Sequence, residues 1–441
     1  MSLKALLLPM ISRRLFSRQR LLAKRAKAER LRIAKDAPHV VHYFHQVDDP
    51  YSALTASALP ELLARYDIAL SVHIVDAPPD SAAPERDKLI AYSRLDAARL
   101  AKHYGLEFSD TGRQPSAEAI AEASSLLVAN HEAEAFAKIA GQVSQNLWQF
   151  RTDLCAGLDS HLTHTRASST AVAAHKASAN QLRARRGHYL GATFFYAGEW
   201  YWGIDRLYHL EQRLQALAAH KHAVSTLLFA PTADLKAPVS CVKPPDIHFF
   251  FSFRSPYSAI VAPRVFALAR MTGANVKLRY VLPMVMRGLP VPADKRSYIS
   301  HDTAREAFVR NIPFGCINDP VGKPTERGLA LIAYAERIGC GEAYVMSFMQ
   351  GVWAEGINAG SDHGLRRIAE RAGLNWIEAQ QALRNDNWRL QAERNRDDMF
   401  ALGLWGVPSF KVGNVCTWGQ DRLWVVAEEL LKTAVTDKAP S

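Results

Sequence analysis

The pattern of hydrophobic and polar residues changes abruptly near the middle of the chain. A run of apolar residues, "FFFSF" in 249–253, is followed by Arg254-Ser255-Pro256. After this point apolar residues recur at three- and four-residue spacing as far as residue 272, which predicts a helix over 256–272. The run before it predicts a strand over 246–253, and a second apolar segment predicts a strand over 276–281.

The same pattern occurs earlier in the chain. "DDPYSALTASALPELLARYDIALSVHIV" (48–75) parallels "RSPYSAIVAPRVFALARMTGANVKLRYV" (254–281), so that Pro50 corresponds to Pro256. The earlier stretch predicts a strand over 41–47, a helix over 50–65 and a strand over 70–75. We therefore expect the chain to contain two tandem copies of one fold.

Each copy continues with a long block of helical periodicity. Each then closes with two short strands around a glycine, Gly198 or Gly413, and a final helix. This order predicts an α/β fold of the thioredoxin type with a helical insertion. In "GVPSF" (406–410) a proline directly precedes a short strand, and in thioredoxin-like folds the proline at this place follows a cis peptide bond.

The predicted organisation has four parts. They are a basic and helical leader (1–37), a first thioredoxin-like copy (38–225), a proline-rich linker (226–245) and a second thioredoxin-like copy (246–435).

The leader carries nearly all of the chain's net charge. Of the net charge of +11, residues 1–37 contribute +9, from eleven Lys or Arg and only Glu29 and Asp36 as acids. The remainder is almost neutral, which argues against a nucleic-acid-binding body. Three interpretations of the leader stay open: a solvated or partner-docking helix, a contact with a membrane surface or acidic partner, and an organellar transit segment. No apolar run approaches the ~20 residues of a transmembrane helix.

The cysteines and histidines indicate no metal site. The five cysteines lack C-x-x-C spacing, and their odd number argues against a disulfide framework, so we expect a reducing, cytoplasmic location. His39, His42 and His45 recur every third residue, which cannot place all three on one face of a strand. His161 and His164 could share a helical face but have no acidic or cysteine neighbour.

Ser255 stands at the predicted start of a helix, with proline after it. The simpler interpretation is an N-cap, worth ~1 kcal/mol. The helix N-terminus also favours an anion such as a thiolate, and reactive cysteines of thioredoxin-like enzymes occupy this place. Since the residue here is serine, the functional interpretation is that a cofactor brings the thiol and the Ser255 hydroxyl donates to its sulfur.

Residues 246–435 resemble the 2-hydroxychromene-2-carboxylate isomerase and kappa-class glutathione transferase family, within the DsbA-like thioredoxin group. The resemblance rests on five stretches in the family's order: "FFFSFRSPYSAI", "DKRSYISHDTAREAFVRNIPF", "GVWAEG", "GVPSF" and "WGQDRL". It implies glutathione as cofactor and Ser255 as the residue that holds its thiolate. Residues 38–225 resemble the same family more faintly.

The resemblance also implies other glutathione contacts. The backbone of Val407, next to Pro408, would pair with the cysteinyl part as an added strand does. Gln420 and Asp421 would bind the γ-glutamyl end, and Lys295 would lie near the glycine carboxylate. The alternative roles are a helix cap for Asp421 and a solvated ammonium for Lys295. The family has an asparagine near the position of Leu289, so one contact is expected to be missing.

Three functions follow from these residues. The first is a glutathione-dependent isomerase or transferase acting on a small electrophile, which the family resemblance implies is aromatic. The second is a non-catalytic thioredoxin-like scaffold, and the third is a thiol-disulfide oxidoreductase, which the serine disfavours. Asp49 and Thr193 replace the serine and the proline in the first copy, so we expect that copy to be structural, or to hold a different small-molecule pocket with Asp49 and Asp205. The two copies are expected to form a pseudo-dimer within one chain.

Overall fold

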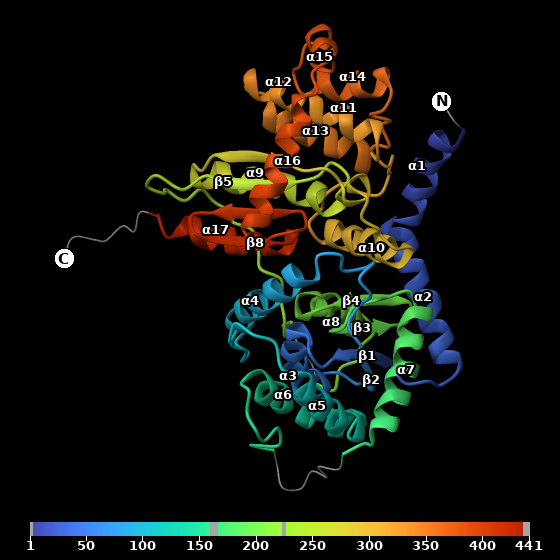
Figure 1. Ribbon diagram of the computed structural model, residues 1–441. Helices are drawn as coiled ribbons and strands as arrows, with labels where there is room; N and C mark the ends of the chain where they lie inside the picture. The colour runs from blue at the N-terminus through green and yellow to red at the C-terminus, as the bar shows by residue number, and fades with distance from the viewer. Residues whose placement is uncertain (1–2, 159–165, 223–225, 435–441) are drawn as a thin grey trace, which may run out of the picture. The chain divides into compact units, whose positions relative to one another are not determined.

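A computed structural model describes residues 3–158, 166–222 and 226–434 of the chain. The chain divides into two compact units, which are drawn in Figure 1. The N-terminal unit comprises residues 23–231 and 292–298, and the C-terminal unit comprises 1–22, 232–291 and 299–441. The leader and the predicted linker are each divided between the two units, and a short segment of the second copy groups with the first. The predicted domain bounds stay a prediction.

The N-terminal unit is built on a four-stranded sheet of order β2-β1-β3-β4. β1 and β2 are parallel, whereas β1–β3 and β3–β4 are antiparallel. Its elements are α2 (Arg18–Ala34, from residue 23 onward), β1 (Val40–Gln46), α3 (Pro50–Arg65), β2 (Ala69–Val75), α4 (Arg86–Tyr104), α5 (Ala117–Ala129), α6 (Ala133–Trp148), α7 (Ser169–Arg185), β3 (Thr193–Tyr196), β4 (Glu199–Trp202), the 3-10 turn η1 (Ile204–Arg206) and α8 (Leu207–Ala216).

The C-terminal unit has a sheet of the equivalent order, β6-β5-β7-β8, with the same pattern of parallel and antiparallel pairs. Its elements are α1 (Leu3–Leu15), β5 (Ile247–Phe251), α9 (Pro256–Thr272), β6 (Val276–Tyr280), η2 (Met284–Arg287), α10 (Ala293–Val309, from residue 299 onward), α11 (Lys323–Ala330), α12 (Ile332–Arg337), α13 (Gly341–Ala354), α14 (Asp362–Arg371), α15 (Trp376–Ala382), α16 (Asn387–Ala401), β7 (Ser409–Val412), β8 (Val415–Trp418), η3 (Gln420–Arg422) and α17 (Leu423–Leu431). Two sheets of one order are what the predicted duplication requires, although the duplication itself stays a prediction.

The strand–helix–strand predictions are confirmed in both units. The helices predicted over 50–65 and 256–272 are α3 and α9, with the same bounds. Proline in the first turn fixes each start, since the missing N–H has no helical partner at that position. In α9 the end is fixed by Gly273, which closes the helix with a φ of 72°.

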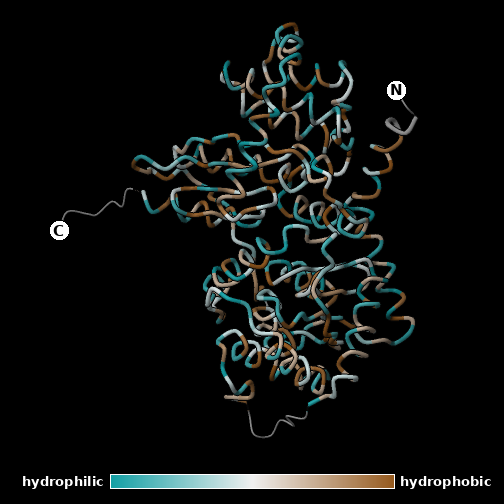
Figure 2. Tube along the Cα trace, in the orientation of Figure 1, coloured by the Kyte–Doolittle hydropathy of each residue, from teal (hydrophilic) through white to brown (hydrophobic). Residues whose placement is uncertain are grey.

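The core of the C-terminal unit lies between its sheet and its helices. The inner face of β5 contributes Phe249 and Phe251, which are fully buried and stack with ring centroids 5.1 Å apart. Helices α11 to α15 gather in one group, seen at the top of Figure 1, and α13 packs against α9. Figure 2 shows hydrophobic positions recurring between hydrophilic ones along these helices, as expected for helices with one buried face. This packing holds the N-terminus of α9 at the edge of a rigid core.

Candidate functional site

The candidate site begins where β5 leads into α9. Ser255 is the N-cap of α9, and its hydroxyl oxygen accepts a hydrogen bond from the backbone N–H of Ser258 at 3.1 Å. Its backbone is extended, with φ −93° and ψ 113°, as an N-cap requires. The remaining N–H groups of the first turn and the helix dipole make this end of α9 favourable for an anion.

The loop before β7 completes this part of the site. The Ser255 hydroxyl donates to the carbonyl oxygen of Val407 at 3.2 Å, and the Val407–Pro408 peptide bond is cis. The neighbouring Gly406 is confined, because a Cβ atom there would lie 2.7 Å from the indole nitrogen of Trp418. The structure thus brings together Ser255, Val407 and Pro408, three of the predicted site residues, across 152 positions of sequence.

Aromatic side chains line the core directly behind Ser255. Phe253 stacks on Phe348 with a centroid distance of 3.9 Å, and the indole N–H of Trp353 donates to the carbonyl of Phe253 at 3.0 Å. Arg254, which lies between Phe253 and Ser255, forms a two-pronged ion pair with Asp319 at 2.8 and 2.9 Å. These contacts fix the backbone of residues 253–254 and therefore the position of Ser255.

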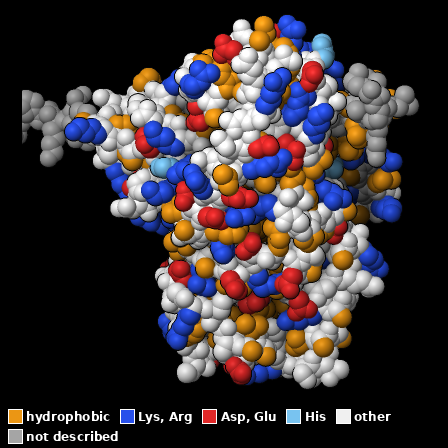
Figure 3. Space-filling model, turned by 45° about the horizontal axis from the view of Figure 1, so that its top comes forward, with side chains coloured by type: hydrophobic (Ala, Val, Ile, Leu, Met, Phe, Trp, Pro, Cys, Tyr) orange, Lys and Arg blue, Asp and Glu red, His pale blue; other side chains and the backbone are white. Residues whose placement is uncertain are grey.

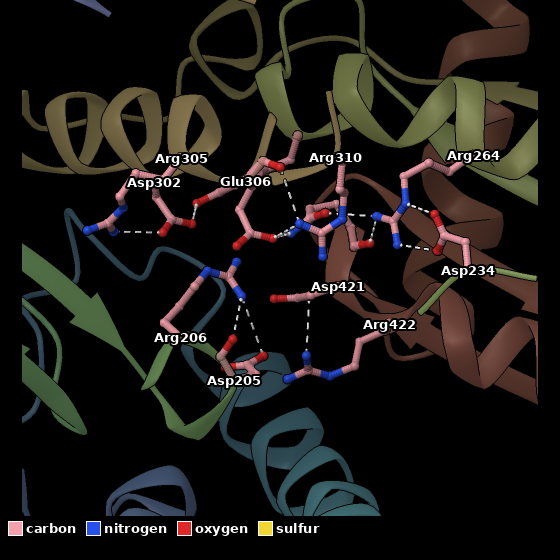
Figure 4. Close-up of polar contacts among 12 residues, drawn as sticks. Asp205, Arg206, Asp234, Arg264, Asp302, Arg305, Glu306, Arg310, Asp421 and Arg422 are labelled. Atoms are coloured by element: carbon pink, nitrogen blue, oxygen red, sulfur yellow. Dashed lines mark hydrogen bonds and ion pairs between the residues drawn. The ribbon is translucent and has the colours of Figure 1, made fainter. Parts of the chain in front are cut away.

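Gln420 and Asp421 lie in η3, and their environments differ. Gln420 is 1% exposed, donates to Glu306 at 2.6 Å and accepts from Arg264 at 3.0 Å. Asp421 is less buried and forms an ion pair with Arg422 at 3.2 Å. Figure 4 shows Arg264 and Glu306 with their further partners, Asp234 and Arg310. The Gln420 side chain therefore holds η3 against α9 and α10, a role that the sequence alone did not indicate.

Comparison with known proteins assigns this unit. Residues 246–431 match the family model of the DSBA-like thioredoxin domain. A curated relative, the 2-hydroxychromene-2-carboxylate isomerase of Sphingobium xenophagum, is 25% identical over 193 residues, which cover 42% of this chain and 97% of the relative.

Residues 246–431 are a DsbA-like thioredoxin domain. Two solved structures with this fold are similar to the chain. One is a 2-hydroxychromene-2-carboxylate isomerase, 22% identical with a TM-score of 0.37, which covers 42% of this chain and 94% of its own. The other is the cytosolic disulfide reductase DsbM from Pseudomonas aeruginosa with GSH, 21% identical with a TM-score of 0.35, which covers 42% of this chain and 99% of its own.

Lys295 lies outside the compact unit that holds the rest of the DsbA-like domain. It belongs to the segment 292–298, which groups with the N-terminal unit. Its ammonium donates to the carbonyl of Ala82 at 2.7 Å, and burial lowers its pKa to about 8. Lys295 and Ser255 belong to different units, and the predicted contact of Lys295 with glutathione stays a prediction.

The N-terminal unit has a carboxylate where the DsbA-like domain has Ser255. Asp49 is the N-cap of α3 and accepts from the backbone N–H groups of Tyr51 at 3.3 Å and Ser52 at 3.0 Å, and from the Ser52 hydroxyl at 2.8 Å. Burial raises the Asp49 pKa to about 6, and the nearby Asp48 charge adds to that rise while the Ser52 hydrogen bond opposes it. A small cavity of about 70 Å³, lined by residues including Asp48, Asp49 and Trp202, opens beside this carboxyl. The helix start is already occupied by its own anion, which would repel a bound thiolate.

Each unit contains an equivalent tyrosine–aspartate hydrogen bond. The Tyr257 hydroxyl donates to Asp302 at 2.7 Å, and the Tyr51 hydroxyl donates to Asp96 at 2.8 Å. Both pairs span 45 positions and tie the first turn of a cap-bearing helix to the next long helix. Tyr51 and Asp96 stand in the first copy where Tyr257 and Asp302 stand in the second, so the repeated pattern of the sequence could have indicated this contact.

The histidines of the N-terminal unit are engaged with separate partners. His39 contacts the Tyr196 hydroxyl at 2.6 Å, His42 contacts His73 at 2.9 Å, and His45 contacts the Tyr43 hydroxyl at 3.0 Å. Among residues 3–158, 166–222 and 226–434 the structure holds no group of three His, Cys, Asp or Glu side chains placed to bind a metal ion. His161 and His164 lie outside the described residues.

Two of the cysteines are poor nucleophiles. Burial raises the pKa of both Cys155 and Cys316, so the reactive thiolate form of each is suppressed near neutral pH. In the described part of the chain, no helix is long and apolar enough to cross a membrane.

Proposed function

We propose that the DsbA-like domain binds glutathione at the N-terminus of α9 and holds its sulfur as a thiolate through Ser255. The observation that carries this proposal is a serine hydroxyl at the helix start, within hydrogen-bond distance of the Val407 carbonyl. A helix N-terminus and a hydroxyl donor both lower the pKa of a thiol placed there. The isomerase and the GSH-bound reductase among the similar proteins support a glutathione-related function in general.

The contact between Ser255 and Val407 explains how binding would proceed. A serine hydroxyl has one proton to donate, and here it is directed to the Val407 carbonyl. When the cysteinyl part of glutathione pairs with this loop as an added strand, its amide N–H donates to that carbonyl instead. The Ser255 proton is then free to turn toward the sulfur, so backbone pairing and thiolate stabilisation are coupled.

The chemistry we propose is addition of the thiolate to an electrophilic, aromatic substrate. The sulfur lone pair forms a C–S bond at the β-carbon of a conjugated carbonyl, and the π electrons of the double bond move to the carbonyl oxygen. The former double bond can now rotate, and reversal of the step expels the thiolate, so no net oxidation occurs. In the transferase alternative, the enolate takes a proton and the adduct leaves.

We propose that the N-terminal unit is a degenerate copy that supports the DsbA-like domain. The shared sheet order and the paired Tyr–Asp contacts support a common origin for the two units. Asp49 in the place of Ser255 makes glutathione binding by the first copy unfavourable. The pseudo-dimer arrangement, the predicted domain bounds and the cytoplasmic location remain parts of this proposal.

Calorimetric titration with reduced glutathione tests the proposal. We expect one site per chain, with affinity reduced at least tenfold by Ser255→Ala, because a hydrogen bond to a charged group contributes about 1.5–3 kcal/mol. Ser361→Ala is the matched control, since Ser361 is an N-cap serine of α14 in the same unit and accepts from Gly364 at 3.0 Å. Two sites, or equal effects of the two variants, would contradict the assignment.

A non-catalytic scaffold is the second candidate, and the burial of Gln420 favours it. Gln420 is almost fully buried, and its amide is already bonded to Glu306 and Arg264, which supports a structural role for it in place of a contact with a γ-glutamyl group. Leu289 likewise stands where the family has a polar contact. If no glutathione binds at millimolar concentration while the domain stays folded, the scaffold function replaces the enzyme.

A thiol-disulfide oxidoreductase is the third candidate, and the helix starts weigh against it. Ser255 and Asp49 occupy the two positions where a reactive cysteine is needed. We expect no reduction of insulin by the purified protein in the presence of dithiothreitol beyond the rate with the reductant alone.

A further inference from the structure

Helix α1 is held to the C-terminal unit along one narrow stripe. Pro9 is buried close to Gly356, where an added Cβ would lie 2.6 Å from the proline ring. The Ser12 hydroxyl accepts from the backbone N–H of Ile317 at 2.9 Å. Phe16, one turn further on, packs edge-on against His301 with a centroid distance of 5.2 Å. Positions 9, 12 and 16 recur at helical spacing, so they form one face of the segment.

The opposite face of α1 carries exposed apolar side chains and, in its last turn, Arg14. Leu7 is 48% exposed, Leu8 47%, Met10 70% and Ile11 60%. At 100° per residue Leu7, Met10 and Ile11 lie on the arc facing away from Pro9 and Ser12, and Leu8 lies at the edge of that arc beside Ser12. Four large apolar side chains within five residues form a patch, whereas isolated exposed apolar residues are ordinary. We call them the outer face of α1.

The charged residues of the first 28 positions, which include α1, are all basic. Arg13, Arg14, Arg18 and Arg20 are all exposed, and the first acidic residue of the chain is Glu29. On the part of the surface visible in Figure 3, Lys and Arg side chains lie among Asp and Glu side chains instead. A partner of the outer face must therefore accept bulky apolar side chains and carry negative charge beside them.

We propose that the outer face of α1 docks on an anionic lipid membrane, with the helix lying in the membrane interface. Such a surface takes up the convex apolar face of a helix without a shaped groove, and it attracts the flanking arginines. An acidic protein would match the arginines, but it would need a groove fitted to the arc of four apolar side chains. With 13 residues α1 is too short to span a bilayer, so it would lie on the membrane and keep its contacts with the C-terminal unit.

Sedimentation with lipid vesicles tests the proposal on the full chain. We expect binding to vesicles of phosphatidylcholine and phosphatidylserine, much weaker binding to phosphatidylcholine alone, and a loss of binding as salt is raised. Arg13→Gln with Arg14→Gln should weaken binding about 25-fold, since each arginine near such a surface contributes roughly a factor of five. Leu7→Gln with Ile11→Gln should weaken it at least tenfold.

The chain offers a matched control. Leu31 and Ile33 of α2 are also exposed, at 54% and 61%, and Leu31→Gln with Ile33→Gln should leave vesicle binding unchanged. Circular dichroism confirms that each variant is folded. The proposal is overturned if the α2 variant loses binding as much as the α1 variant, or if the chain does not bind anionic vesicles at low salt. The proposal is also overturned if the α1 substitutions dissociate a dimer in sedimentation, because the partner of the outer face would then be a second copy of the chain. Binding of polyglutamate as tight as binding to the vesicles would overturn it as well, because an acidic polypeptide would then suffice.

Discussion

The carboxyl of Asp49 should make the N-terminal unit less stable at neutral pH than in mild acid. Burial raises its pKa in the folded state to about 6, from 3.8 for the free side chain. The folded state therefore binds more protons than the unfolded state between these values. The contribution of Asp49 to the free energy of unfolding is most favourable below about pH 4. It is lost as the pH rises from about 4 through 6, and it is not regained at higher pH.

The size of the effect follows from the same shift. The pKa difference corresponds to roughly 3 kcal/mol between the neutral and the ionised carboxyl. Asp49→Asn removes the charge but keeps an amide oxygen that can accept from Ser52. Its NH₂ group cannot accept from Tyr51, and the loss of that bond costs about 1 kcal/mol. We therefore expect a gain of about 1–3 kcal/mol near pH 7.5 and little change near pH 4.

Urea-dependent hydrogen exchange of peptides from α3 measures this, because it reports on the N-terminal unit alone. The matched control is Asp67→Asn, the same chemical change at an exposed position two residues after the end of α3. The reasoning is refuted if Asp49→Asn keeps the pH dependence of the natural chain, or if Asp67→Asn abolishes it equally.

Three further predictions concern the buried polar contacts. Tyr257→Phe should lower the free energy of unfolding of the C-terminal unit by about 1.5–3 kcal/mol in urea titration, because it removes a hydrogen bond to the fully buried Asp302. Gln420→Leu should cost about 1–3 kcal/mol in the same titration, because it leaves the buried Glu306 without one of its donors, and an unchanged midpoint would contradict the network. In the natural chain we expect the free energy of unfolding to rise between about pH 8 and pH 10.5, because the folded state releases the Lys295 proton at a lower pH than the unfolded state does. Lys295→Met should abolish this rise. A rise of the same size in the variant would show that another group causes it.

The sequence predicts the strand–helix–strand units well because their signals are local. Hydrophobic spacing changes from strand to helix at Ser255, and Pro256 and Gly273 mark the ends of α9, so its predicted bounds agree with the structure. The N-cap role of Ser255 and the cis bond before Pro408 were also predictable, because each belongs to a short motif.

Contacts between distant segments were not predictable in the same way. From "WGQDRL" the side-chain amide of Gln420 was predicted to bind a ligand. Its partner Glu306 lies 114 positions away in the sequence, so only the folded chain shows that the two side chains are hydrogen-bonded. The leader was predicted to be one basic helix, yet it forms two helices. Pro9 of α1, and Phe16 in the turn after α1, pack on the C-terminal unit. The spacing of residues along the sequence predicts single helices and strands, but it does not show which distant segments contact each other.

The packing of α1 on the C-terminal unit limits what a deletion of the leader can show. Deleting residues 1–36 would remove the outer face of α1, which we propose as a docking surface. The deletion would also expose the surface near Gly356 and Ile317 on which α1 packs. A loss of activity in that truncation would then have two causes. Substitutions on the outer face of α1 separate them, because they leave Pro9, Ser12 and Phe16 in place.

The measurement that tests the central claim most directly is the pKa of the glutathione thiol when it is bound to the protein. Thiolate absorbance in the ultraviolet, followed across pH for the natural chain, Ser255→Ala and Ser361→Ala, gives this value. We expect a bound thiol more acidic than free glutathione, and a pKa about one to two units higher in Ser255→Ala than in the natural chain, since the lost hydrogen bond contributes about 1.5–3 kcal/mol. Ser361→Ala should leave it unchanged. A bound thiol with the same pKa in all three proteins would show that Ser255 does not hold the thiolate.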